Sequence, residues 1–60
     1  MVYVSEFLSM VAELKADKKI TVYNVTLDEV KDMTVRRVVI EYPYYYVKCY
    51  SIQTNTLVIF

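Results

Sequence analysis

The sequence predicts an α+β fold in one small domain spanning residues 1–60. Three observations predict it: apolar residues at helical spacing near the N-terminus, a helix-capping pattern near the middle, and alternating apolar residues in the C-terminal half. We expect an N-terminal amphipathic helix packed on a small antiparallel sheet, with one short intervening helix and a C-terminal three-stranded meander. A domain of this size buries only about 60% of the surface that it exposes when unfolded, so its stability depends on packing and association.

The composition limits the chemistry available to the chain. Seven basic and seven acidic residues give a formal charge of zero, which does not favour nonspecific binding of nucleic acid or of an anionic membrane. There is no histidine and only one cysteine, Cys49, so an intrachain disulfide and the usual zinc-binding spacings are excluded. We therefore expect no metal, no cofactor and no small-molecule substrate.

The N-terminus does not resemble a secretory signal. It lacks a basic leader and carries Glu6 and Glu13 within its apolar region, and no run approaches the roughly 18 apolar residues of a membrane span. We expect a cytoplasmic protein that is a complete small gene product and keeps its thiol reduced.

The N-terminal region has the pattern of an amphipathic helix. Its apolar residues recur three and four positions apart, and they are Val4, Phe7, Leu8, Val11 and Leu14. This spacing predicts a helix over residues 5–16, which Ser5 can cap. In residues 18–25, Ile20 and Val22 lie on one side of an extended chain and the residues between them on the other. The segment is also rich in β-branched side chains, so it is predicted to form a strand.

A second, short helix is predicted over residues 27–33. Thr26 and Glu29 have capping-box spacing, and Val25 and Val30 stand where a hydrophobic staple would place them. The acidic residues of this segment interact favourably with the first turn of a helix, and they lack the loop geometry of a calcium site. We interpret them as structural residues.

The C-terminal half is predicted to form three antiparallel strands. Residues 34–42 alternate, Pro43 interrupts the pattern, residues 44–52 resume it, and LVIF at residues 57–60 closes the chain. The segment QTNT between the last two strands has turn chemistry at Asn55. The backbone edge of the terminal strand would be free to pair with another chain.

Five of the seven tyrosines lie within residues 42–50, and the register of this hairpin decides where they point. A four-residue loop over residues 43–46 places these side chains on the inner face: Val38, Ile40, Tyr42, Tyr45, Val47 and Cys49. Cys49 should therefore be buried and unreactive. The outer face then holds the predicted partner-binding residues Arg37, Tyr44, Tyr46, Lys48 and Tyr50. A three-residue loop with a bulge would shift the register by one residue and reassign the tyrosines.

Both faces of the predicted sheet are apolar, whereas the chain has only one long helix to cover them. We therefore expect a small non-catalytic protein–protein interaction module that binds a host protein or itself through the tyrosine-rich face. Self-association as a homodimer would use this face or the terminal strand. A Gly-free, Tyr-rich chain of this size resembles the small proteins with which bacterial viruses and plasmids inhibit host immunity or transcription enzymes.

Further functions are open. The bases of a single-stranded nucleic acid can stack on sheet tyrosines while Arg36, Arg37 and Lys48 hold phosphates. The chain can also be a small dimeric regulator that uses the same tyrosines and basic residues. Zero net charge and the absence of a recognisable nucleic-acid-binding motif disfavour the nucleic-acid alternative. An enzyme is least favoured, because a chain of this length rarely encloses a pocket and Cys49 has no histidine partner.

Overall fold

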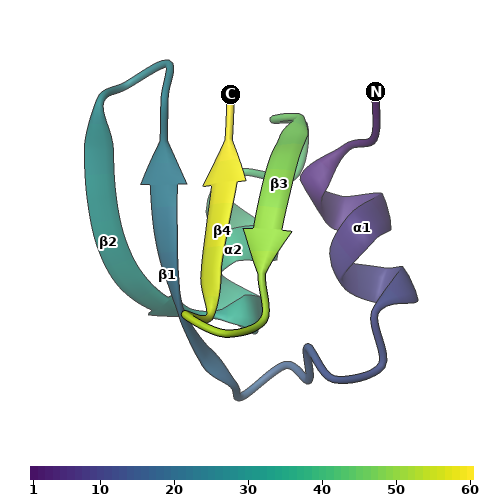
Figure 1. Ribbon diagram of the computed structural model, residues 1–60. Helices are drawn as coiled ribbons and strands as arrows, with labels where there is room; N and C mark the ends of the chain where they lie inside the picture. The colour runs from purple at the N-terminus through teal and green to yellow at the C-terminus, as the bar shows by residue number, and fades with distance from the viewer.

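The computed structural model describes residues 1–60 and confirms the α+β class. In chain order the elements are helix α1 (Val4–Met10), strands β1 (Lys19–Asn24) and β2 (Glu29–Thr34), helix α2 (Val35–Glu41), and strands β3 (Val47–Ser51) and β4 (Thr56–Ile59) (Figure 1). Neither helix is long and apolar enough to cross a membrane.

The four strands form one mixed sheet in the order β2-β1-β4-β3. β1 pairs antiparallel with β2 and parallel with β4, and β4 pairs antiparallel with β3. Figure 1 shows α2 behind the middle of the sheet and α1 to the side of β3. The fold therefore has a helical layer and a sheet layer, and the opposite face of the sheet carries no helix.

The core lies between the sheet and the two helices. Alternate strand residues point into it, because successive side chains of a strand lie on opposite faces. The sheet contributes the buried residues Ile20, Val22, Leu57 and Ile59, and the helices contribute Val4, Leu8, Val35 and Val38. Leu14, Met33 and Tyr42 complete the cluster of 11 buried apolar residues.

Helix α1 is shorter than predicted. It begins at Val4 without a side-chain cap, so the predicted cap at Ser5 is wrong, and it ends at Met10. Val11 is extended, with φ of −96° and ψ of 109°. The amide of Leu14 then donates to the carbonyl of Val11 at 3.1 Å, so Leu14 is buried from a turn. The apolar spacing correctly indicates which residues lie in the core or pack against it, but not how far the helix extends.

One short intervening helix is present, α2, but its predicted position at residues 27–33 is wrong, because strand β2 occupies this segment. β1 and β2 form a hairpin in which Asn24 lies opposite Glu29. In the connecting turn, the side-chain oxygen of Asn24 accepts from the amide of Leu27 at 3.0 Å, and Asp28 has a φ of 53°. Asparagine and aspartate favour such turns, whereas the capping box of Thr26 needs a helical backbone that the hairpin does not provide. Pairing with β1 outweighs the local capping signal.

The predicted strand that follows is also wrong, since helix α2 replaces it. Thr34 caps this helix, and its hydroxyl oxygen accepts from the amide of Arg37 at 3.2 Å. Val35, Val38 and Tyr42 are three and four residues apart, so the helix directs all three into the core. A strand would place Val35 and Val38 on opposite faces. Burial therefore overrides the strand propensity of this valine-rich segment.

The C-terminal three-stranded meander is consequently not formed. Strands are present where they are predicted at residues 18–25, 44–52 and 57–60, but of the three strands predicted for the meander only the last two, β3 and β4, form and pair as an antiparallel hairpin. β4 lies between β1 and β3, so the predicted self-association through a free edge of LVIF is wrong. The two edge strands of the sheet are β2 and β3 instead.

Replacing Thr34 by alanine should destabilise the fold by about 0.5 to 2 kcal/mol, because α2 loses its cap. Thr26→Ala is the matched control, since Thr26 is exposed in a turn and its replacement should change the free energy of unfolding by less than about 0.5 kcal/mol. Urea denaturation of both variants measures the difference. A larger loss for Thr26→Ala would instead favour a helix that begins at Thr26.

Candidate functional site

The two-layer fold leaves to solvent the face of the sheet that carries no helix, which we call the open face. Its side chains form rows across the strands, because directly paired residues share a face. One row is polar, and it contains Asp32 on β2, Thr21 on β1, Thr56 on β4 and Ser51 on β3. The hydroxyl of Thr21 donates to the carboxylate of Asp32 at 2.7 Å. This polar row borders an apolar surface.

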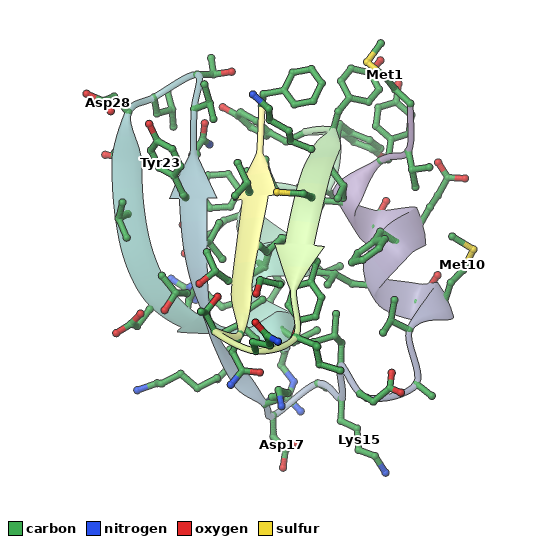
Figure 2. All side chains as sticks on the ribbon, in the orientation of Figure 1. Met1, Met10, Lys15, Asp17, Tyr23 and Asp28 are labelled. Atoms are coloured by element: carbon green, nitrogen blue, oxygen red, sulfur yellow. The ribbon has the colours of Figure 1, made fainter.

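The adjoining row, the central row, is apolar and spans all four strands. The register places Val30 on β2, Tyr23 on β1, Val58 on β4 and Cys49 on β3 side by side. Figure 2 shows Tyr23 on the near side of β1, away from α2. Val30 is 66% exposed, and Cys49 is exposed as well. Tyr23 and Val58 between them are half-buried, so the central row is an apolar band that is most accessible at its two ends.

A third row, the aromatic row, lies beyond the adjacent ends of β3 and β4. Tyr46 and Phe60 exchange two backbone hydrogen bonds of 2.8 and 2.9 Å, and Tyr3 forms an antiparallel bridge with Tyr46. The ring centroids of Tyr3 and Tyr46 are 5.0 Å apart with an interplanar angle of 11°, and those of Tyr46 and Phe60 are 5.8 Å apart. Tyr44 extends this aromatic surface through an edge contact with Tyr3 at 5.7 Å.

The contact between Tyr3 and Tyr46 has an electrostatic consequence. The pKa of Tyr3 is raised above its usual value, first by the hydrogen bond between the two side chains and then by their Coulomb interaction. A tyrosine is neutral at physiological pH in any case, and the raised pKa extends the neutral range of Tyr3 to more alkaline solution. Tyr3 presents to a ligand a hydroxyl group without charge.

Lys48 places a cation beside the aromatic row. It lies where the register between β3 and β4 shifts, between Val47 and Cys49, an irregularity of the β-bulge type. Together with Val25 and Phe60, Lys48 lines a hollow of about 240 Å³. This lining suits an apolar group that carries a negative charge beside it.

Three of the predicted binding residues come together at this end of the open face. Tyr44 and Tyr46 contribute to the aromatic surface, and Lys48 lies beside it. Tyr50 points to the helical layer instead, where its ring packs against the phenylalanine of α1 at a centroid distance of 6.2 Å. The register shift at Lys48 explains this difference, because it sets Tyr50 opposite the buried Leu57.

The predicted basic residues are divided between the two layers. Arg36 and Arg37 are exposed on α2, and the guanidinium of Arg37 contacts the carboxylate of Glu41 at 2.6 Å. They lie on α2 because the segment predicted as a strand is a helix. Arg37 therefore does not share a face with Lys48, contrary to the prediction.

The predicted inner face is partly correct. Tyr42 is buried, with 7% of its surface exposed, and Tyr45 packs edge-on against it at a centroid distance of 5.3 Å. The predicted burial of Cys49 is wrong, since the register shift turns it onto the open face. Ile40 is also exposed, because α2 directs it away from the core.

Several open-face residues are absent from the predicted site: Tyr3, Tyr23, Val30, Val58 and Phe60. Tyr23 had a usable signal, because strand alternation places it opposite to Ile20 and Val22. Tyr3 had none, since its position depends on pairing with a residue near the other end of the chain.

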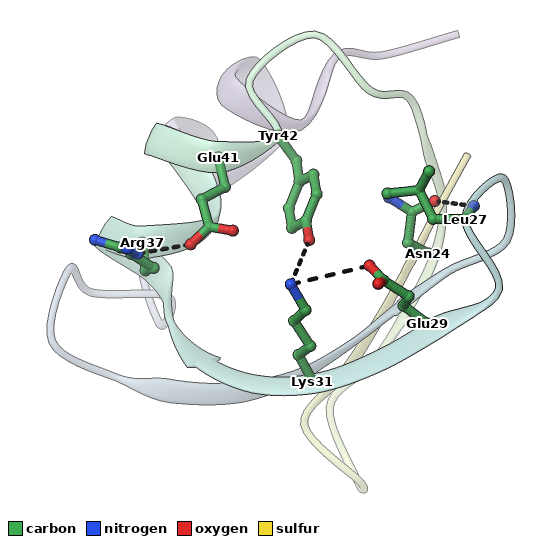
Figure 3. A network of polar contacts seen from close by, with 7 residues as sticks. All are labelled: Asn24, Leu27, Glu29, Lys31, Arg37, Glu41 and Tyr42. Carbon is green, nitrogen blue, oxygen red and sulfur yellow. Dashed lines mark hydrogen bonds and ion pairs between the residues drawn. The ribbon is translucent and has the colours of Figure 1, made fainter.

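A separate group of polar contacts lies where β2 meets α2 (Figure 3). The ammonium of Lys31 donates to the hydroxyl of Tyr42 at 3.4 Å and lies 3.9 Å from the carboxylate of Glu29. The hydrogen bond to Tyr42 is the main cause that raises the pKa of Lys31, and Coulomb interactions with Tyr42 and Glu29 add to it. The side-chain amide nitrogen Nδ2 of the buried Asn24 has no hydrogen-bond partner. The Lys31 contacts tie the C-terminal end of α2 to the sheet.

Comparison of the chain with protein-family models, with curated proteins and with solved structures found no match. The open face is therefore interpreted from its own residues. It combines a central apolar row, an aromatic row and the cation of Lys48. No group of three or more His, Cys, Asp or Glu side chains is placed to hold a metal ion.

Cys49 should react stoichiometrically with a thiol reagent in the native state, because its side chain is exposed on the open face. Adding denaturant should not increase the number of thiols that react. Cys49→Ser is the control for background labelling. Labelling that requires denaturant would place Cys49 in the core.

Tyr42→Ser should destabilise the protein by about 3 to 5 kcal/mol, because it removes a buried aromatic ring. Tyr44→Ser is the matched control, since Tyr44 is 76% exposed and its loss should cost less than about 0.5 kcal/mol. Tyr42→Phe removes only the hydroxyl that Lys31 contacts, so it should remain folded and lose about 0.5 to 1.5 kcal/mol. Chemical denaturation gives all three values, and equal losses for the two serine variants would contradict the core assignment.

Proposed function

We propose that the chain is a small non-catalytic protein–protein interaction module that binds its partner through the open face. The observation that supports the proposal is the uncovered apolar surface formed by the central row and the aromatic row. Exposed apolar patches rimmed by polar residues mark interaction sites, and the row that contains Thr21 and Asp32 supplies such a rim.

The side chains of the open face are of the kinds that protein interfaces favour. Tyr3, Tyr23 and Tyr46 each combine broad apolar area with a polar tip and few rotatable bonds. Lys48 adds a charge next to the hollow that it lines with Phe60. The partner surface that complements these groups is apolar and carries an acidic residue opposite Lys48.

The distribution of cations favours a protein partner over a nucleic acid. The nucleic-acid alternative needs basic side chains beside the tyrosines on which bases stack. Arg36 and Arg37 lie on α2 in the helical layer, and Arg37 is already paired with Glu41. Lys48 is the one of the three that remains beside the aromatic row.

We further propose that the partner is a host protein that this chain inhibits in the cytoplasm, as the small viral and plasmid proteins of similar composition do. Inhibition of this kind needs no catalytic group, because an apolar face of the right shape can occlude a surface of the target. A reducing compartment also keeps the exposed Cys49 as a free thiol.

Matched variants in one capture experiment test the open face. Tyr23→Ser and Lys48→Glu alter this face, whereas Ile40→Ser and Arg37→Glu remove an apolar residue and reverse a charge on α2. A partner captured from extracts of the source cell should bind at least about tenfold more weakly to the first two variants and normally to the controls. Bound partner should also slow the labelling of Cys49.

Other outcomes would contradict this site. Equal capture by all four variants would place the binding surface elsewhere. Binding that disappears on nuclease treatment and weakens steeply with salt would favour the nucleic-acid alternative. A labelling rate of Cys49 that is the same in the free protein and in the complex would argue against contact at the central row.

A further inference from the structure

The outer edge of strand β2 pairs with no other strand along the whole length of β2. This strand is an edge strand of the sheet, and no element lies beyond it in Figure 1. The opposite edge is partly covered, because residues 2–4 run beside the start of β3. There the amide of Val47 donates to Val2 at 2.9 Å, and the amide of Val4 donates to Tyr45 at 2.8 Å. The outer backbone groups of β2 are therefore available to extend the sheet.

We propose that a second copy of this chain pairs with this edge, β2 antiparallel to β2, about a twofold axis at Val30. The two four-stranded sheets then form one sheet of eight strands. Antiparallel pairing of identical strands gives a closed dimer, because each copy offers the same edge to the other. The proposal is independent of what the open face binds.

The charges of β2 select this register. With the axis at Val30, Glu29 of each copy lies opposite Lys31 of the other, so two pairs of opposite charge form. Registers centred on Glu29, Lys31 or Asp32 place that charged side chain opposite its own copy. A register centred on Met33 forms neither pair. Registers with the axis between two neighbouring residues are excluded. They would set residues of opposite faces against each other, whereas directly opposed residues of antiparallel strands share a face.

The side chains for these pairs are accessible. Lys31 and Glu29 lie on the same face of β2, and their side chains are 48% and 46% exposed. Val30 lies between them on the open face, so pairing at Val30 joins the central rows of the two copies. One contact opposes this register, since Asp28 lies opposite Asp32. Asp28 belongs to the turn, where its φ of 53° takes the chain out of the strand.

Two charge-reversal variants test the contact between copies. Glu29→Lys provides only cations at the pairing positions and Lys31→Glu provides only anions, so each variant alone should dimerise at least about tenfold more weakly than the parent protein. A 1:1 mixture should form a heterodimer, because both pairs between positions 29 and 31 again have opposite charges. Mixing changes only contacts between chains, and sedimentation equilibrium measures the dissociation constants.

Glu41→Lys and Arg37→Glu are the matched controls. They make the same changes of charge at the ion pair on α2. Each should dimerise like the parent protein, and their mixture should associate no more strongly. Thermal melting checks that every variant is folded. Asp28→Asn is a further control that leaves both pairs intact, and it should dimerise like the parent protein, because Asp28 lies in the turn and outside the pairing strand.

Specific results would overturn the proposal. The first is a parent protein that stays monomeric up to about 1 mM. The second is a dimer that Glu29→Lys and Lys31→Glu leave intact, and its loss in Lys48→Glu would assign self-association to the open face. The third is a mixture of the two charge variants that associates no better than either alone, which would exclude the Val30 register.

Discussion

The parallel pairing of β1 with β4 is the constraint on which the rest of the structure depends. The amide of Thr21 donates to Asn55 and that of Val25 to Ile59, both at 2.8 Å, which fixes the last strand in the middle of the sheet. Parallel neighbours need a crossover, and α2 lies on it and covers one face. β2 and β3 are left at the two edges, which decides where another chain can add a strand.

Lys48 divides the tyrosines between the two faces. In a regular strand, Tyr46 and Tyr50 would share a face, because they are four residues apart. The register shift at Lys48 leaves Tyr46 in the aromatic row and turns Tyr50 toward α1. The same shift brings Cys49 to the open face. One irregular residue therefore decides which side chains of β3 lie on the open face.

A chain of 60 residues provides two helices of seven residues, of which α2 lies behind the sheet and α1 lies beside β3, so neither covers the open face. The open face and the edge of β2 remain uncovered for the same reason, which is the lack of further elements. They have different uses, because side chains make the contacts of a face, whereas the backbone makes those of an edge. An eight-stranded sheet would keep both open faces accessible, so pairing of copies and binding of a partner are compatible.

The sequence by itself determined the α+β class, the presence of an N-terminal helix, three of the strands, the burial of Tyr42 and the grouping of Tyr44, Tyr46 and Lys48. Only the tertiary structure decided the conformation of residues 25–42, since the local signals favoured a helix where β2 forms and a strand where α2 forms. Pairing with β1 made the first part a strand, and burial made the second part a helix. Pairing of Tyr3 with Tyr46, which is distant in sequence, likewise placed Tyr3 in the aromatic row. Contacts between residues distant in sequence decided these features, and no local pattern records them.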